Sequence, residues 1–212
     1  MDTASDLPVL SPAETRVLGC LIEKKETTPD IYPLTVNALV QAANQKTSRE
    51  PVMSLEPADI HRALKQLEGK GLVRQQFASR VERYEHLAGQ KFALTQAQLA
   101  ILGLLMLRGP QTAYELLSRA ERMARIGSIE ELKSNLDLLI GRRPALVLEL
   151  GRAPGQREER FAHLLAGEPA VAPAAAPRMD RPASTPGDLE ARVEALEAEM
   201  ADLRQKLRGL LE

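Results

Sequence analysis

The chain has 212 residues, which suits one larger domain or two small ones, and 44% of them are apolar, enough for a packed core. Aromatic residues make up only 3% and tryptophan is absent, so the expected core consists of Leu, Val, Ile and Ala. The formal net charge of −1 excludes a polycation, and any affinity for nucleic acid must come from a local basic patch.

The single cysteine and the apolar runs indicate the compartment. Cys20 alone cannot form a disulfide within one chain, which favours a reducing environment, and we interpret it as a small buried hydrophobe. The first residues lack the basic and apolar regions of a signal peptide. The longest apolar run, near AILGLLML, is about eight residues, whereas a membrane-spanning helix needs about 20. We therefore expect a cytoplasmic protein.

Residues 10–90 are predicted to form a first domain, after a flexible N-terminus at residues 1–9. A serine N-cap, a proline at the first helical position and a capping-box glutamate predict that a helix begins after Ser11. The elements that follow are two further helices and two short strands, predicted over 34–43, 57–70, 72–77 and 81–87.

Residues 91–165 repeat this order and are predicted to form a second domain. LSPAETRVLGCLI (10–22) is similar to LTQAQLAILGLLM (94–106), and RYEHL (83–87) returns as RFAHL (160–164). Capping boxes are predicted at the starts of its helices, at Thr95, Thr112 and Ser128. Alternating leucines predict a strand with one buried face, at Leu146, Leu148 and Leu150. The repeated aromatic residues, Tyr84 and Phe161, are interpreted as core side chains beneath two hairpins.

Three helices followed by a two-stranded hairpin is the winged-helix arrangement, a helix-turn-helix variant. The predicted fold class is therefore mainly α with small β-hairpins (α+β): two tandem winged-helix domains plus a C-terminal coiled-coil helix.

The C-terminal part is predicted to be a linker and a coiled coil. Residues 166–187 are rich in Ala and Pro and have little to bury. In residues 188–212 apolar side chains recur at heptad spacing, at Leu189, Val193, Leu196, Met200, Leu203, Leu207 and Leu210. Flanking charges of opposite sign favour a parallel two-stranded coiled coil and hence a homodimer. The alternative is a helix that folds back on the domains or frays.

No motif for catalysis, metal binding or cofactor binding is found in the sequence. Gly-rich phosphate loops, GxSxG, HExxH and Cys/His ligand spacings are absent, and no pair of carboxylates stands out by its spacing. Of the three histidines, His86 and His163 occupy matching repeat positions, whereas His61 lies on the third helix. We therefore predict a non-enzymatic protein with no catalytic residues, no metal and no cofactor.

Nucleic-acid binding is the remaining chemistry, because the third helix of a winged helix typically enters the major groove. Basic and acidic residues are equal in number over 56–70, whereas over 128–140 a single lysine faces three acidic residues. If DNA is bound, the third helix of the first copy is therefore better suited to contact it. The second copy contributes to DNA binding only through Arg152 and Arg157 of its hairpin. The predicted nucleic-acid-binding residues are Lys46, Arg49, Arg62, Lys65, Arg74, Arg80 and Arg83. The expected partner is double-stranded DNA.

Two alternatives remain open. In the first alternative, these Lys and Arg side chains are ordinary solvated residues and bind no partner. Tandem winged helices without basic third helices also serve as protein–protein modules, so an interaction adaptor that binds no DNA is the competing hypothesis.

The stretch TTPDIYPLTVNALVQAANQK (27–46), with REPVMSL and ASRVERYEHL, resembles the YceH-like family of uncharacterised bacterial proteins. The resemblance runs from Leu10 to Leu165, and many members also end in a short heptad tail. It implies two winged-helix domains in a cytosolic bacterial setting, but no established activity, ligand or target. Four polar residues match the family pattern without a role that carries over: Asn37, Asn44, Gln45 and Lys46. From the residues themselves, such amides either cap helices or contact a partner.

Overall fold

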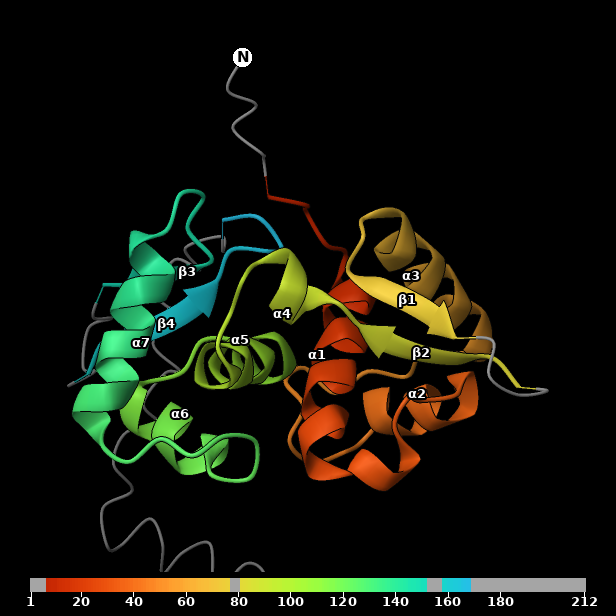
Figure 1. Cartoon of the computed structure of the whole chain (residues 1–212), viewed down its shortest axis with the longest axis horizontal. Helices are drawn as coiled ribbons and strands as arrows, with labels where there is room; N and C mark the ends of the chain where they lie inside the picture. The colour runs from red at the N-terminus through yellow and green to blue at the C-terminus, as the bar shows by residue number, and fades with distance from the viewer. Residues whose placement is uncertain (1–6, 77–80, 152–157, 169–212) are drawn as a thin grey trace, which may run out of the picture. The chain divides into compact units, whose positions relative to one another are not determined.

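The computed structural model describes residues 7–76, 81–151 and 158–168, which form a mixed α/β body with seven α-helices and two short antiparallel strand pairs (Figure 1). The predicted coiled coil at 188–212 lies outside the described residues, as does the linker beyond residue 168. The same holds for three of the arginines discussed above: Arg80, Arg152 and Arg157.

The first half of the body has the predicted order of elements. They are α1 (Pro12–Thr27), the 3₁₀ turn η1 (Pro29–Ile31), α2 (Val36–Ala43), α3 (Pro57–Gly69), β1 (Val73–Gln76) and β2 (Arg83–His86). The capping box at the start of α1 is confirmed, because Ser11 and Glu14 each accept the other's backbone N–H. After the C-terminal end of α3, Gly71 adopts φ 65°, and this left-handed conformation lets the chain turn back into β1.

The second half repeats the order after one extra short helix. The elements are α4 (Ala88–Lys91), α5 (Gln96–Arg108), α6 (Ala113–Ala120), α7 (Ile129–Gly141), β3 (Val147–Leu150) and β4 (Arg160–His163). The predicted capping boxes at Thr95 and Thr112 are confirmed. The box at Ser128 is only half formed, because the Glu131 carboxylate accepts the N–H of Gly127 at 2.8 Å instead of that of Ser128.

Each hairpin is extended by one residue that precedes the second helix of its half. Leu34 and Tyr84 exchange two backbone hydrogen bonds of 3.1 and 2.8 Å, and Gln111 and Phe161 exchange two of the same lengths. Tyr84 and Phe161 are 6% and 7% exposed and belong to the core, as predicted. Strand pairing and core packing therefore meet at the same aromatic residue in both halves.

The predicted alternation of leucines along the second hairpin is wrong. Leu146 and Val147 are both buried although adjacent, whereas Leu148 is exposed and Leu150 half-buried. Leu146 lies before β3, where its N–H bonds to the carbonyl of Leu139 and its own carbonyl accepts from Leu164. Along β3 itself burial is therefore confined to the end next to Leu146, whereas on β4 Phe161 and Ala162 are buried.

The two halves share one core. α1 packs against α5 in the middle of the body, with α2, α3 and the first hairpin on the side of α1, and α6, α7 and the second hairpin on the side of α5 (Figure 1). Cys20 is fully buried in this core, and burial raises the pKa of its thiol to about 11, as expected for an unreactive apolar side chain. Among the described helices, none is long and apolar enough to cross a membrane.

Candidate nucleic-acid interface

The outward face of α3 is the centre of the predicted surface. Ile60, Leu64 and Leu67 form the buried stripe of this helix, with at most 1% of each side chain exposed. The opposite face exposes Arg62 and Lys65, together with the amide of Gln66. A helix with one apolar stripe against the core thus presents two cations and an amide to solvent, which are the donor types that contact phosphates and base edges.

Arg62 and Arg74 each have an acidic neighbour. The Arg62 side chain is 69% exposed and lies 3.1 Å from a carboxylate oxygen of Asp59, one turn earlier on α3. Arg74 of β1 is 59% exposed and donates from Nε to Glu85 at 2.8 Å across the hairpin. Because exposed ion pairs contribute at most about 1 kcal/mol, phosphate oxygens can replace either carboxylate.

Four of the seven predicted residues are exposed, and they come from adjoining segments. Lys46 lies in the loop between α2 and α3, and Arg74 follows on β1, which packs against α3. The set consists of Lys46, Arg62, Lys65 and Arg74 and is called the α3 surface below. Arg80 belongs to the segment outside the described residues.

Arg49 does not belong to the α3 surface, which corrects the prediction. Its side chain is 0% exposed, and two of its guanidinium nitrogens donate to the carboxylate of Glu23 on α1 at 3.0 and 2.6 Å. Its third nitrogen, Nε, donates to the carbonyl of Ala42 at 3.0 Å. Burial alone would raise the pKa of the Glu23 carboxyl, but the Arg49 guanidinium keeps this pKa below its usual value. A phosphate could reach Arg49 only by breaking this buried pair.

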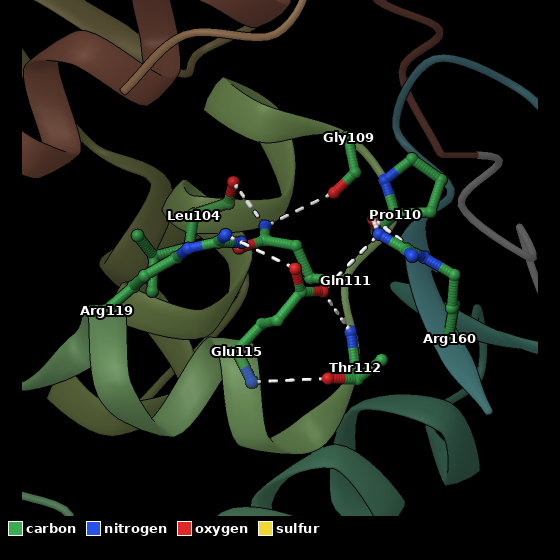
Figure 2. A network of polar contacts seen from close by, with 8 residues as sticks. All are labelled: Leu104, Gly109, Pro110, Gln111, Thr112, Glu115, Arg119 and Arg160. Carbon is green, nitrogen blue, oxygen red and sulfur yellow. Dashed lines mark hydrogen bonds and ion pairs between the residues drawn. The ribbon is translucent and has the colours of Figure 1, made fainter. Parts of the chain in front are cut away.

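The prediction that Arg83 binds nucleic acid is also corrected, because its side chain contacts the backbone of the protein. Its Nη1 donates to the carbonyl of Pro33 at 2.8 Å and to that of Ile31 at 3.3 Å. Arg160, the matching residue of the second half, donates to the carbonyl of Pro110 at 2.7 Å, as Figure 2 shows. The repeated arginine therefore ties the closing strand to the segment before the second helix, and a backbone contact rather than a phosphate contact explains it.

A second polar network surrounds Gln111 and is confined to the second half (Figure 2). The buried amide of Gln111 donates to the carbonyls of Leu104 and Gly109, and its oxygen accepts from Arg119 at 2.6 Å. Glu115 accepts from Arg119, Arg160 and the N–H of Thr112. Leu34 occupies the position of Gln111 in the first half and has no such network. Since these groups satisfy one another, the network holds α6 to β4 and offers no open chemistry.

Polar contacts explain part of the stretch 27–46 that resembles the YceH-like family, at Ala43 and Asn44. Arg16 of α1 is 2% exposed and donates to the carbonyls of Ala43 and Pro51. Asn44 clamps Leu55 through two hydrogen bonds of 2.9 and 2.7 Å, which settles its role as scaffold. Arg16 was not predicted, although an arginine beside the apolar stripe VLGCLI is a signal of a buried hydrogen-bonding residue.

The repeated histidines, His86 buried and His163 half-buried, are uncharged at neutral pH. Burial lowers the pKa of His86 and that of His163 to about 4 each. Within residues 7–76, 81–151 and 158–168, no cluster of three or more His, Cys, Asp or Glu side chains could hold a metal ion. These histidines therefore supply no positive charge to a nucleic-acid surface at pH 7.

The second half presents a different surface at the matching positions of α7. Where α3 exposes Arg62, Lys65 and Gln66, α7 exposes Ser134, Asp137 and Leu138. The buried stripe is the same in both helices, so the duplication has kept the core and changed the outer face.

Comparison with known proteins identifies the family. Residues 10–156 match the family described as "Protein of unknown function, DUF480". The chain belongs to the DUF480 family. The match spans both halves and ends within the second hairpin, and it agrees with the YceH-like resemblance of the sequence motifs.

DUF480 relatives are similar over their whole length. A UPF0502 protein of Mesorhizobium japonicum is 65% identical over 207 residues, which cover 98% of this chain and 99% of the relative. A UPF0502 protein of Xanthomonas axonopodis pv. citri is 54% identical, with 98% and 95% covered. One of Stenotrophomonas maltophilia is 48% identical, with 97% and 95% covered.

Proposed function

We propose that this DUF480 chain is a non-enzymatic, cytoplasmic bacterial protein that associates with DNA in a regulatory role, and that each half is a winged helix. The observation that carries the proposal is the exposed stripe of Arg62, Lys65 and Gln66 on α3. The winged-helix interpretation is supported by the order of helices and strands in each half, and by the single residue that extends each hairpin.

The α3 surface acts through charge in this proposal. Each lysine or arginine that contacts phosphate releases condensed counterions, so affinity falls as salt rises, with a slope that counts the contacts. The amide of Gln66 adds a donor and an acceptor for a base edge, and adenine is the base that a glutamine side chain pairs with in two hydrogen bonds. At the positions that match Arg62, Lys65 and Gln66, α7 has Ser134, Asp137 and Leu138, so α3 is the recognition helix of the pair.

The test is a salt titration of duplex DNA binding, followed by fluorescence anisotropy, with wild type and the double variant Arg62→Glu plus Lys65→Glu. Losing two phosphate contacts should reduce the slope of log K against log salt by about 2. Arg125→Glu plus Lys133→Glu is the matched control, because both cations are exposed outside the α3 surface and their replacement should leave the slope unchanged. Equal affinities of double variant and wild type at every salt concentration would remove the α3 surface from the proposal.

A protein-interaction adaptor is the second candidate, and the outer face of the second half supports it. Tyr114 of α6 is 58% exposed and Leu138 of α7 is 61% exposed. α7, the third helix of this half, has more acidic than basic residues. Large exposed apolar side chains are more typical of protein contacts than of DNA contacts.

A pull-down from bacterial lysate with nuclease treatment separates the two candidates. Partners that disappear with nuclease support DNA association. Partners that persist with nuclease, and are lost in a Tyr114→Ser plus Leu138→Ser variant, support the adaptor. Both candidate functions include a homodimer, for which residues 188–212 are the proposed coiled-coil segment.

A further inference from the structure

A pocket of about 370 Å³ lies where the ends of α3, α4 and α7 meet. Four of its lining side chains are cationic, Lys70, Lys91, Arg142 and Arg143, and no acidic side chain lines it. Phe92 contributes to an apolar wall. Two other pockets in the described part of the chain have fewer cations in their linings, and neither the α3 surface nor the Gln111 network uses this one.

Two of the cations occupy matching positions in the duplicated chain. Lys70 is the C-cap residue of α3 and follows Gly69, and Arg142 is the C-cap residue of α7 and follows Gly141. The two third helices therefore deliver one cation each to the same pocket. Lys91, the last residue of α4, and Arg143, next to Arg142, complete the set.

Backbone contacts hold these side chains near the pocket. The Lys91 ammonium donates to the carbonyl of Lys70, and Arg142 donates to the carbonyl of Phe92. The first contact ties α4 to the end of α3, and the second ties α4 to the end of α7. Arg143 is exposed, and its recorded hydrogen bond is to the carbonyl of its neighbour Arg142 at 3.2 Å. The cations are thus placed by the fold.

The charges are only partly balanced within the protein. Lys70 pairs with Glu14, a residue that is 2% exposed and does not line the pocket. No ion pair is recorded for Lys91, Arg142 or Arg143 within the described residues. Like charges gathered in a recess raise the local positive potential, and a bound anion relieves their mutual repulsion.

We propose that this pocket binds a small phosphorylated anion. Guanidinium groups match phosphate oxygens with two parallel hydrogen bonds, and lysine ammonium groups add charge without directional demands. The volume lies at the lower end of the range for small-molecule sites, about 300–1,000 Å³, and suits a compact ligand such as a diphosphate or a phosphorylated sugar. Such a ligand would contact the ends of α3 and α7 together and so link the two halves.

The experiment is isothermal titration of the full chain with two probes, pyrophosphate and ADP, at low salt. The pocket variant is Lys91→Gln plus Arg143→Gln, which removes two charges but keeps N–H donors and leaves the Lys70–Glu14 pair intact. The matched control is Arg125→Gln plus Lys133→Gln, two exposed cations outside the pocket and outside the α3 surface, with the same change of net charge. We expect the pocket variant to bind pyrophosphate at least tenfold more weakly than wild type, and the control to bind as wild type does.

The outcomes separate this proposal from DNA association. An equal loss of affinity in both variants would show a general charge effect and overturn the pocket, as would the absence of binding of both probes to wild type at millimolar concentration. If duplex DNA displaces pyrophosphate and the pocket variant loses DNA affinity to the same extent, the cations serve DNA and the small-anion site is wrong. The thermal unfolding temperature of each variant, without ligand, checks that it is folded.

Discussion

Gly103 of α5 lies against Ile22 of α1, so closely that a Cβ on this glycine would come within 2.8 Å of the Ile22 Cγ2. The contact has a counterpart in the other direction. A Cβ on Gly19 of α1 would come within 3.0 Å of the Leu107 side chain and within 3.2 Å of the Cβ of Met106, both on α5. Gly19 and Gly103 are matching residues of the repeat, as are Ile22 and Met106. The two first helices therefore pack through a symmetric exchange of a glycine and a large apolar side chain.

This packing predicts that Gly103→Leu destabilises the protein, because the added side chain has no room between α5 and α1. Overpacking of this kind typically costs about 1–3 kcal/mol. The free energy of unfolding in urea measures the effect. Gly141→Ala is the control, since no heavy atom lies within 4 Å of a Cβ at that position, and it should cost nothing. Equal stability of Gly103→Leu and wild type would show that the helices can separate at this point.

The sequence predicted these helices and strands well because the signals are local. Capping boxes mark the starts of α1, α5 and α6, and the apolar stripe of α3 is the one that the structure buries. The shared core could not be predicted in this way. A glycine in the middle of α5 has no local signature of a helix crossing, and its meaning depends on which distant helix packs there.

The Arg49–Glu23 pair predicts a large loss of stability when one partner is removed. The Glu23 side chain is 15% exposed and that of Arg49 is not exposed, so Arg49→Ala would leave a largely buried carboxylate with only Lys24, at 3.2 Å, as its cation. Breaking such a pair typically costs about 3–5 kcal/mol. Arg62→Ala, which opens an exposed pair, should change stability by less than about 1 kcal/mol. Thermal unfolding followed by circular dichroism compares the two, and similar effects would contradict the difference in burial.

The same two arginines show why the candidate site was only partly predictable. Arg49 and Arg62 are both basic residues near the third helix, and composition alone places them on one surface. Their difference arises from Glu23, which is distant in sequence and reaches Arg49 only after α1 has packed beside the loop. The cations of the pocket were missed for a related reason, because Lys70 and Arg142 meet only when both halves are folded together.

The heptad seam predicts a homodimer that depends on residues 188–212. Removing these residues should convert a dimer into a monomer, since the seam is then the only contact that holds two copies together. Light scattering coupled to size-exclusion chromatography gives the mass directly. Replacing Leu196 and Leu203 with Asp is the subtler variant, because it keeps the length of the chain and removes two of the apolar residues. A mass that stays the same after truncation would show that the seam does not dimerise.

The buried histidines predict that stability falls as pH drops below neutral. Burial lowers the pKa of His86 and of His163 to about 4, from an ordinary value of 6.5, so between these values the unfolded chain binds more protons than the folded one. Their contribution is complete above pH 6.5 and is lost as the pH falls towards 4. Each histidine should add about 1.4 kcal/mol to the loss per pH unit in this window.

The slope of unfolding free energy against pH isolates this effect from the carboxylates that also titrate in acid. The effect is easiest to attribute to His86, because neither of its ring nitrogens has a hydrogen-bond partner among the described residues. Its ring lies edge-on to Tyr32. His86→Leu plus His163→Leu should flatten the slope between pH 6.5 and 4.5, whatever its effect on stability at pH 7. An unchanged slope in the double variant would mean that both histidines accept protons in the folded protein.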